Sequence, residues 1–283
     1  MKNLTTNSTT FRNLFPLATI MVGLLLWIPQ GWAVTIHSVA AGGDWNKAET
    51  WVGGQVPTAD DSVVINGEVA VDYTTIVTEL TVSLGGTLVN DNYNRTVTVN
   101  GNLVNNGTIS NNERGALYLD IAGNITNNGI LNNQRINFIE GSATSKIKAN
   151  APIESTDIIL NANIEIVGNA TFTSKINFND KKLIVNQSNV VNFKGDASGT
   201  GTIQGNGKLR FAGSYFSGIL TGKIEEIIFD GQEQNIYGQF TANSIIFGGS
   251  AHKNITSTTI INGSAIINEG VTLLNDNYNR TAG

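Results

Sequence analysis

The chain has 283 residues, of which only 14% are charged, and its formal net charge is −5. This length accommodates one large solenoid or two ordinary globular domains. The negative charge offers no electrostatic attraction to nucleic acid or to an anionic membrane, so we expect neither as a partner. The absence of cysteine excludes disulfides, thiolate metal sites and cysteine nucleophiles.

Residues 1–33 have the pattern of an export signal. Lys2 and Arg12 precede an apolar run over residues 14–28, and Pro29 then breaks the pattern. The run is short for a membrane span, and Gly31 and Ala33 place small residues where a signal peptidase cleaves. We therefore predict a signal peptide over 1–33 and a mature chain that is secreted or at the cell surface, with no transmembrane segment. An uncleaved N-terminal anchor is the alternative.

Residues 34–70 are predicted to form an N-terminal cap and the first strands. Trp45 and Trp51 stand between Gly pairs, and Pro57 follows before a β-branched strand pattern ending at Ile65. Indoles supply a large apolar area, so we expect Trp45 and Trp51 to cover the open end of a core. The alternative is that the same two indoles form a stacking platform for sugar rings.

Residues 42–65 carry a signature that resembles the opening segment of many bacterial secreted surface proteins and the start of the extracellular eight-glycine domain, a β-rich module. The signature is a Gly and a Trp, a second Trp before Gly-Gly, a Pro, and then Asp before a strand. The resemblance implies a secreted surface protein and carries over no catalytic residue.

The clearest repeat aligns residues 99–111 with residues 121–133, 22 positions later. Leu103 aligns with Ile125 and Ile109 with Leu131, while the Gly-Asn and Asn-Asn-Gly corners fall in register. A period of this length, without a helical pattern, indicates the coil of a β-helix. We therefore predict an all-β, right-handed parallel β-helix over residues 71–283, with coils of about 20–22 residues and a shared aliphatic core.

The same alignment places asparagines over asparagines. Asn105 falls over Asn127, and Asn106 over Asn128. Stacked amides stabilise parallel, in-register strands, so these four residues are predicted to form asparagine ladders. The alternative is that they are hydrophilic turn residues. The Asn-Asn-Gly-Thr-Ile pattern is also similar to passenger regions of autotransporter and haemagglutinin-type adhesins, which implies a surface solenoid and leaves its ligand open.

From residue 153 to residue 247 the repeat is degenerate, but short apolar runs bounded by Gly, Asn or Asp continue. Residues 88–96 then return almost unchanged at 273–281. The chain stops two residues later, inside what would be the next strand. We expect the sequence to be the N-terminal piece of a longer protein or a truncated reading frame, the alternative being a natural end covered by another chain.

The sequence contains few signals of catalysis. Its two histidines, His37 and His252, are far apart, and no phosphate-binding or calcium-repeat motif is complete. A step of 22 residues aligns Asp91, Glu113 and Arg135, the one constellation that would suit a polysaccharide lyase or hydrolase. These positions fall in Asn-rich corners, where charges are usually solvated.

We therefore predict a secreted or cell-surface structural and adhesive solenoid without catalytic activity and without a cofactor. Its expected partners are glycans or surface proteins. Four tyrosines could contact them, or could be part-buried strand residues: Tyr93, Tyr118, Tyr215 and Tyr237. The alternative is a polysaccharide-active β-helix enzyme.

Overall fold

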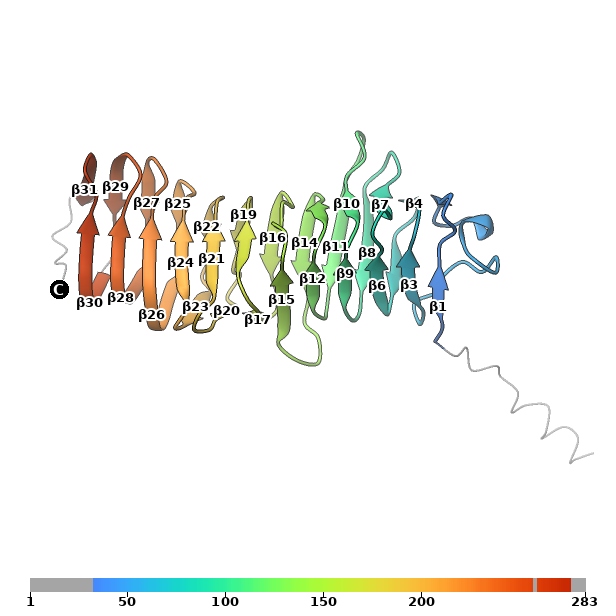
Figure 1. The fold of residues 1–283 in the computed structure, drawn as a ribbon, viewed down its shortest axis with the longest axis horizontal. Helices are drawn as coiled ribbons and strands as arrows, with labels where there is room; N and C mark the ends of the chain where they lie inside the picture. The colour runs from blue at the N-terminus through green and yellow to red at the C-terminus, as the bar shows by residue number, and fades with distance from the viewer. Residues whose placement is uncertain (1–32, 257–258, 276–283) are drawn as a thin grey trace, which may run out of the picture. The chain divides into compact units, whose positions relative to one another are not determined.

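The computed structural model describes residues 33–256 and 259–275. They form an all-β parallel solenoid of about 11 turns with coils of about 20 residues, which confirms the predicted fold class. Strands of successive coils stand side by side along one axis (Figure 1). The predicted signal peptide lies outside the described residues except for Ala33, and the right-handed sense of the coil stays a prediction.

Each coil contributes strands to three faces. The first face contains β1 (Thr35–His37), β3 (Ser62–Ile65), β6 (Glu79–Val82), β9 (Leu103–Asn105), β12 (Ile125–Asn127), β15 (Ser145–Ala149), β17 (Ile164–Ile166), β20 (Lys182–Val185) and β23 (Thr202–Gly205). The second face contains β2 (Gly43–Asp44), β4 (Glu68–Val71), β7 (Thr87–Asn90), β10 (Thr108–Ser110), β13 (Ile130–Asn132), β18 (Ala170–Phe172), β21 (Val190–Phe193) and β24 (Lys208–Phe211).

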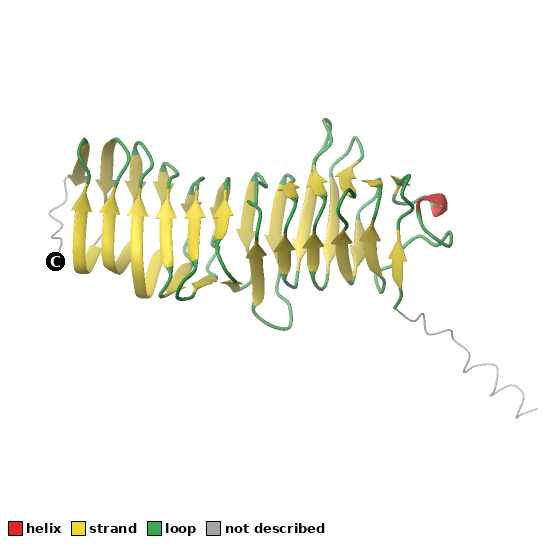
Figure 2. Cartoon of the chain, viewed as in Figure 1, coloured by secondary structure: helices red, strands yellow, loops and turns green. Residues whose placement is uncertain are grey.

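Three long strands, β26 (Ile219–Phe229), β28 (Gln239–Phe247) and β30 (Thr259–Ile267), continue both of these faces. The third face contains β5 (Thr75–Val77), β8 (Arg95–Val99), β11 (Leu117–Ile121), β14 (Arg135–Phe138), β16 (Asp157–Leu160), β19 (Lys175–Asn177), β22 (Ala197–Ser198), β25 (Tyr215–Phe216), β27 (Gln234–Ile236), β29 (Ala251–Ile255) and β31 (Val271–Asn275). Among the described residues the only helical element is the short turn η1 (Ala48–Thr50), near the first strands (Figure 2). None of the helices in this part is long and apolar enough to cross a membrane.

The strand register confirms the predicted repeat. Ile125 pairs in parallel with Leu103, and Leu131 pairs with Ile109. All four side chains are buried, because alternate residues of each strand point into the coil and stack on their counterparts one coil away. Each such side chain contributes about 1.5–3 kcal/mol of hydrophobic stabilisation.

The core changes from aliphatic to aromatic along the second face. An inward column begins with valine, leucine and isoleucine and then becomes a stack of phenylalanines, namely Phe172, Phe193, Phe211, Phe229 and Phe247. Consecutive ring centroids are 5.0 to 5.9 Å apart, at interplanar angles of 8 to 18°. The stack extends the hydrophobic core through the part of the chain where the sequence repeat is degenerate.

Close approach of successive corners explains the recurring glycines. A Cβ built on Gly129 would lie 2.1 Å from the carbonyl oxygen of Gly107, and one built on Gly107 would lie 2.3 Å from that of Gly86. Any side chain here would collide with the backbone of the coil below. The Asn-Asn-Gly corners therefore recur because only glycine lets the turns stack at strand spacing.

Candidate functional site

Trp45 and Trp51 lie together inside the N-terminal end of the core. Their exposed fractions are 0% and 2%, and their rings meet edge to face with centroids 5.0 Å apart. The Nε1–H of Trp51 donates a hydrogen bond of 2.7 Å to the carbonyl oxygen of Trp45. Because protein covers both indoles, neither offers a face to a sugar ring. The alternative in which they form a sugar platform is inconsistent with this burial, whereas a cap requires it.

A buried asparagine ladder lies at the corner that follows the first face, where β9 ends at Asn105 and β12 ends at Asn127. Asn105 and Asn127 are fully buried, and Nδ2 of Asn105 donates to Oδ1 of Asn127 at 2.8 Å. Asn105 also donates to the carbonyl oxygen of Ile130, and Asn127 donates to those of Ala151 and Pro152. The two amides therefore satisfy backbone carbonyls that the corner would otherwise leave unpaired in the core.

A second ladder runs outside the same corner. Nδ2 of Asn128 donates to Oδ1 of Asn106 at 2.7 Å, and Nδ2 of Asn150 donates to Asn128 at 2.6 Å. Asn128 and Asn150 are exposed, so water competes for these bonds. The predicted positions thus form two hydrogen-bonded rows, one buried and one on the surface.

A third polar row was not predicted. Asn137 donates to Asp120 at 3.0 Å, Asn161 donates to Asn137 at 2.6 Å, and Asn179 donates to Asn161. These residues are 17, 24 and 18 positions apart in the chain, so a search at one fixed period cannot align them.

Lys253 is a second group that sequence analysis did not single out. It lies on β29, points into the coil and is fully buried. Its Nζ donates to the carbonyl oxygens of Gly231 and Gln232. Burial lowers the pKa of this lysine, although Asp230 nearby favours the charged form. In the preceding coil Gln234 has the same place and donates to the carbonyls of Phe211 and Gly213.

Asp91, Glu113 and Arg135, the constellation considered for an enzyme, are not stacked at successive coils. Arg135 pairs in register with Tyr118, not with Glu113. The reason is turn length, because residues 111–116 connect β10 to β11 whereas only residues 133–134 connect β13 to β14. The shorter turn moves Arg135 away from the corner and onto the wall of the third face.

Three carboxylates on or beside the third face lie next to a cation. Arg95 binds Asp91 through two hydrogen bonds, of 2.8 and 2.5 Å, and this contact lowers the pKa of Asp91 and raises that of Arg95. Arg135 lies 3.9 Å from Asp120, and Lys175 lies 3.8 Å from Asp157. Within the described part of the chain, no three His, Cys, Asp or Glu side chains are placed to hold a metal ion.

The four tyrosines singled out in the sequence all lie on or beside the third face. Tyr93 precedes β8 and is 67% exposed, while Tyr118 is on β11 beneath the guanidinium of Arg135, 4.6 Å from ring to carbon. Tyr215 and Tyr237 are 38% and 46% exposed, with ring centroids 5.2 Å apart. The coil therefore gathers onto one side aromatic residues that are up to 144 positions apart in the chain.

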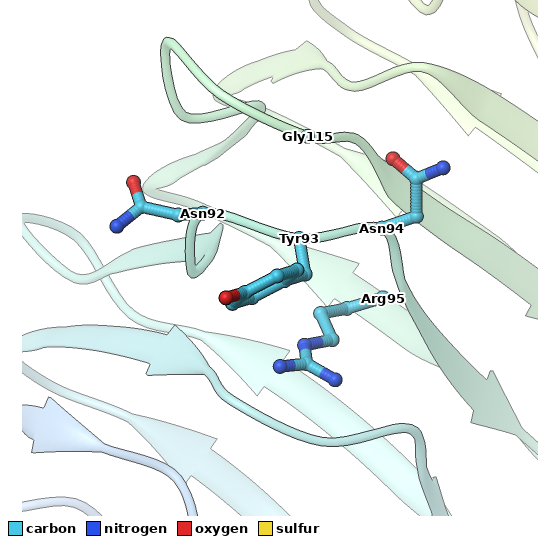
Figure 3. Close-up of a pocket in the computed structure, with 5 residues that line it drawn as sticks. All are labelled: Asn92, Tyr93, Asn94, Arg95 and Gly115. Atoms are coloured by element: carbon cyan, nitrogen blue, oxygen red, sulfur yellow. The ribbon is translucent and has the colours of Figure 1, made fainter.

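The most exposed of these tyrosines lines an open groove. The groove has a volume of about 690 Å³ and is lined by Asn92, Tyr93, Asn94, Arg95 and Gly115 (Figure 3). The guanidinium carbon of Arg95 lies 5.2 Å from the centre of the Tyr93 ring. This arrangement leaves the other face of the Tyr93 ring open to stack a flat or puckered ring, while the exposed amides of Asn92 and Asn94 point away from Tyr93 (Figure 3).

Comparison with known proteins returned no match. The chain matches no family model, no curated protein and no solved structure. The β-solenoid fold rests on the strand pairing of the described residues. A fold of this kind does not by itself determine a function.

Proposed function

We propose that this chain is a secreted or cell-surface adhesive solenoid whose third face binds glycans or surface proteins. The observation that carries the proposal is the gathering of Tyr93, Tyr118, Tyr215 and Tyr237 on or beside that face. Exposed tyrosines add little to the stability of the core. Partner binding, in contrast, favours large and rigid aromatic side chains.

The backbone beneath these residues supports the proposal. Each third-face strand is paired in parallel with a strand of the next coil, from β5 to β31. A wall of this kind holds its side chains in fixed positions over many coils. Several weak contacts can then act together, with little entropy lost on binding.

A polysaccharide-active enzyme is the competing function. Glycoside hydrolysis uses two carboxyl groups, one of which must be protonated to act as an acid. Asp91, Asp120 and Asp157 each lie within 4 Å of an arginine or lysine. The contact with Arg95 lowers the pKa of Asp91, so Asp91 is a poor proton donor, and this favours binding over hydrolysis.

The test compares two triple variants of the full chain. We expect the chain to bind intact bacterial or host cells and immobilised glycans, and Y93A/Y215A/Y237A to lose most of that binding. The matched control V52A/L84A/I130A removes exposed apolar side chains that are not on the third face, and it should bind like the wild type.

Two results would overturn the proposal. One is that the wild-type chain binds no cell or glycan surface, or that both triple variants bind as well as it does. The other is release of soluble oligosaccharides from a polysaccharide by the wild-type chain, which would establish the enzyme instead.

A further inference from the structure

Two neighbouring turns project further from the stack than those around them (Figure 1). The first, residues 91–94, connects β7 to β8, and the second, residues 111–116, connects β10 to β11. The groove of Figure 3 lies where these turns meet, beside the third face. It is open and shallow and is lined by five residues, so a ligand would lie on it rather than be enclosed.

The first turn is held in place from inside the core. The buried side chain of Asn90 donates hydrogen bonds to the carbonyl oxygens of Asp91, Tyr93 and Arg114, at 2.5, 3.0 and 2.9 Å. Its Oδ1 accepts a bond from the backbone N–H of Asn112. One buried amide thus ties both turns together, so the exposed residues between them are fixed before any ligand arrives.

Gly115 allows the two turns to touch. It has a φ of 76°, and a Cβ added there would lie 2.5 Å from the backbone of Tyr93. Only a residue without a side chain fits this contact and this conformation. The second turn therefore supports the backbone that presents the Tyr93 ring.

The groove combines an aromatic ring, amides and balanced charge. Tyr93 is 67% exposed, and Asn92 and Asn94 on either side of it are also exposed. Arg95 lies against the ring, but its charge is matched by the two-point contact with Asp91. Among the five lining residues the one cation, Arg95, is therefore paired, and in the second turn the exposed Glu113 and Arg114 bring one charge of each sign.

We propose that this groove binds one or two units of a neutral glycan, with a pyranose ring stacked on the face of Tyr93 that Arg95 leaves open and the exposed amides of Asn92 and Asn94 available to hydroxyls of the adjoining units. This inference rests on the proposed adhesive function and assigns that function a site and a ligand class. A folded protein partner fits less well, because stable protein interfaces bury about 800 Å² on each side and this groove is lined by only five residues.

The sequence supplies an independent argument. Residues 90–96, Asn-Asp-Asn-Tyr-Asn-Arg-Thr, return without change at 275–281, whereas most coils between them share only their apolar pattern. Packing explains the retention of Asn90, and Arg95 packs against the ring of Tyr93, whereas the described residues show no hydrogen bond of the Asn92 and Asn94 side chains. Binding of one ligand explains why the exposed residues are repeated as well.

The experiment uses the full chain and a panel of neutral and uronic-acid oligosaccharides. Hydrogen exchange measured by mass spectrometry locates binding, because protection of the peptide that covers residues 91–95 reports this groove and no other site. We expect neutral oligosaccharides to protect that peptide. Y93A should raise the oligosaccharide concentration needed for half-maximal protection about tenfold, the equivalent of one stacking contact. Y93F should leave that concentration unchanged.

Y237A is the matched control, since it removes another exposed tyrosine of the third face and should leave protection of residues 91–95 unchanged. Thermal unfolding of each variant checks that the coil is intact. Protection by uronic-acid oligosaccharides alone, or by a surface protein and none of the saccharides, would overturn the inference. If the chain binds cells while residues 91–95 remain unprotected, this inference fails and the adhesive function stands.

Discussion

The buried asparagine ladder provides a direct test of how the corners are stabilised. Asn127 makes three hydrogen bonds inside the core, one with Asn105 and two with backbone carbonyls. A buried hydrogen bond contributes about 1 kcal/mol net, so Asn127→Leu, which keeps a similar volume, should lower the free energy of unfolding by about 3 kcal/mol. Asn105 also makes three bonds, and Asn105→Leu should cost about as much.

The double variant sharpens this test, because one of the bonds is shared. N105L/N127L loses five distinct bonds where the two single variants together lose six, so its cost should fall short of their sum by about 1 kcal/mol. The control is Asn128→Leu in the exposed outer row, which should cost under about 0.5 kcal/mol.

The assay is urea unfolding followed by far-ultraviolet circular dichroism, with the slope of the free energy against urea compared among variants. The reasoning would be refuted if N127L were no more costly than N128L. It would also be refuted if the costs of the two buried substitutions simply added.

Three further predictions concern the core. Gly129→Ala should destabilise the coil by about 1–3 kcal/mol or more in urea unfolding, because its Cβ would meet the carbonyl oxygen of Gly107; a cost near zero would show that the corner can open. Phe211→Ala should cost about 3–5 kcal/mol, and Phe211→Leu clearly less, unless the aromatic stack contributes nothing. Because burial lowers the pKa of Lys253, the unfolded chain binds that proton at pH values where the folded chain has released it. The free energy of unfolding should therefore rise with pH between the folded pKa and the ordinary value of 10.5. Lys253→Met should lack that rise, and equal alkaline slopes in the two proteins would contradict it.

The fold could be predicted because fewer residue types are tolerated at the corners than in the strands. Gly107 and Gly129 must lack side chains, and Asn105 and Asn127 must bond to one another, so these positions repeat at one spacing. Aliphatic residues between them substitute freely for one another. The period was therefore visible in a sequence whose strands are otherwise variable.

Registers beyond the clear repeat could not be predicted, because turn length varies from coil to coil. A spacing of 22 residues holds from Leu103 to Ile125, but the short turn before Arg135 places that residue beside Tyr118, only 17 positions earlier. The phenylalanine stack had a visible signal, since Phe193, Phe211, Phe229 and Phe247 are each 18 residues apart. A search at the 22-residue period cannot find it.

The candidate site was predicted only as separate residues. Tyr93 and its neighbouring asparagines were visible as a repeated segment, but their grouping with Gly115 depends on how two turns of different coils meet. Lys253 was hidden for another reason, because a lysine in a polar strand such as β29 resembles a solvated charge until the direction of its side chain is known.

The buried polar groups stabilise the coil, whereas the exposed tyrosines are available for binding. Asn105, Asn127, Gln234 and Lys253 point inward and bond to corner carbonyls, so much of the polar content of the sequence maintains the stack. Three carboxylates on or beside the third face, Asp91, Asp120 and Asp157, lie next to cations. Once these groups are assigned to the fold, Tyr93 and its flanking amides are an exposed cluster whose identity the fold does not require. Their position on a turn that Asn90 fixes is therefore the basis of the proposed glycan-binding site.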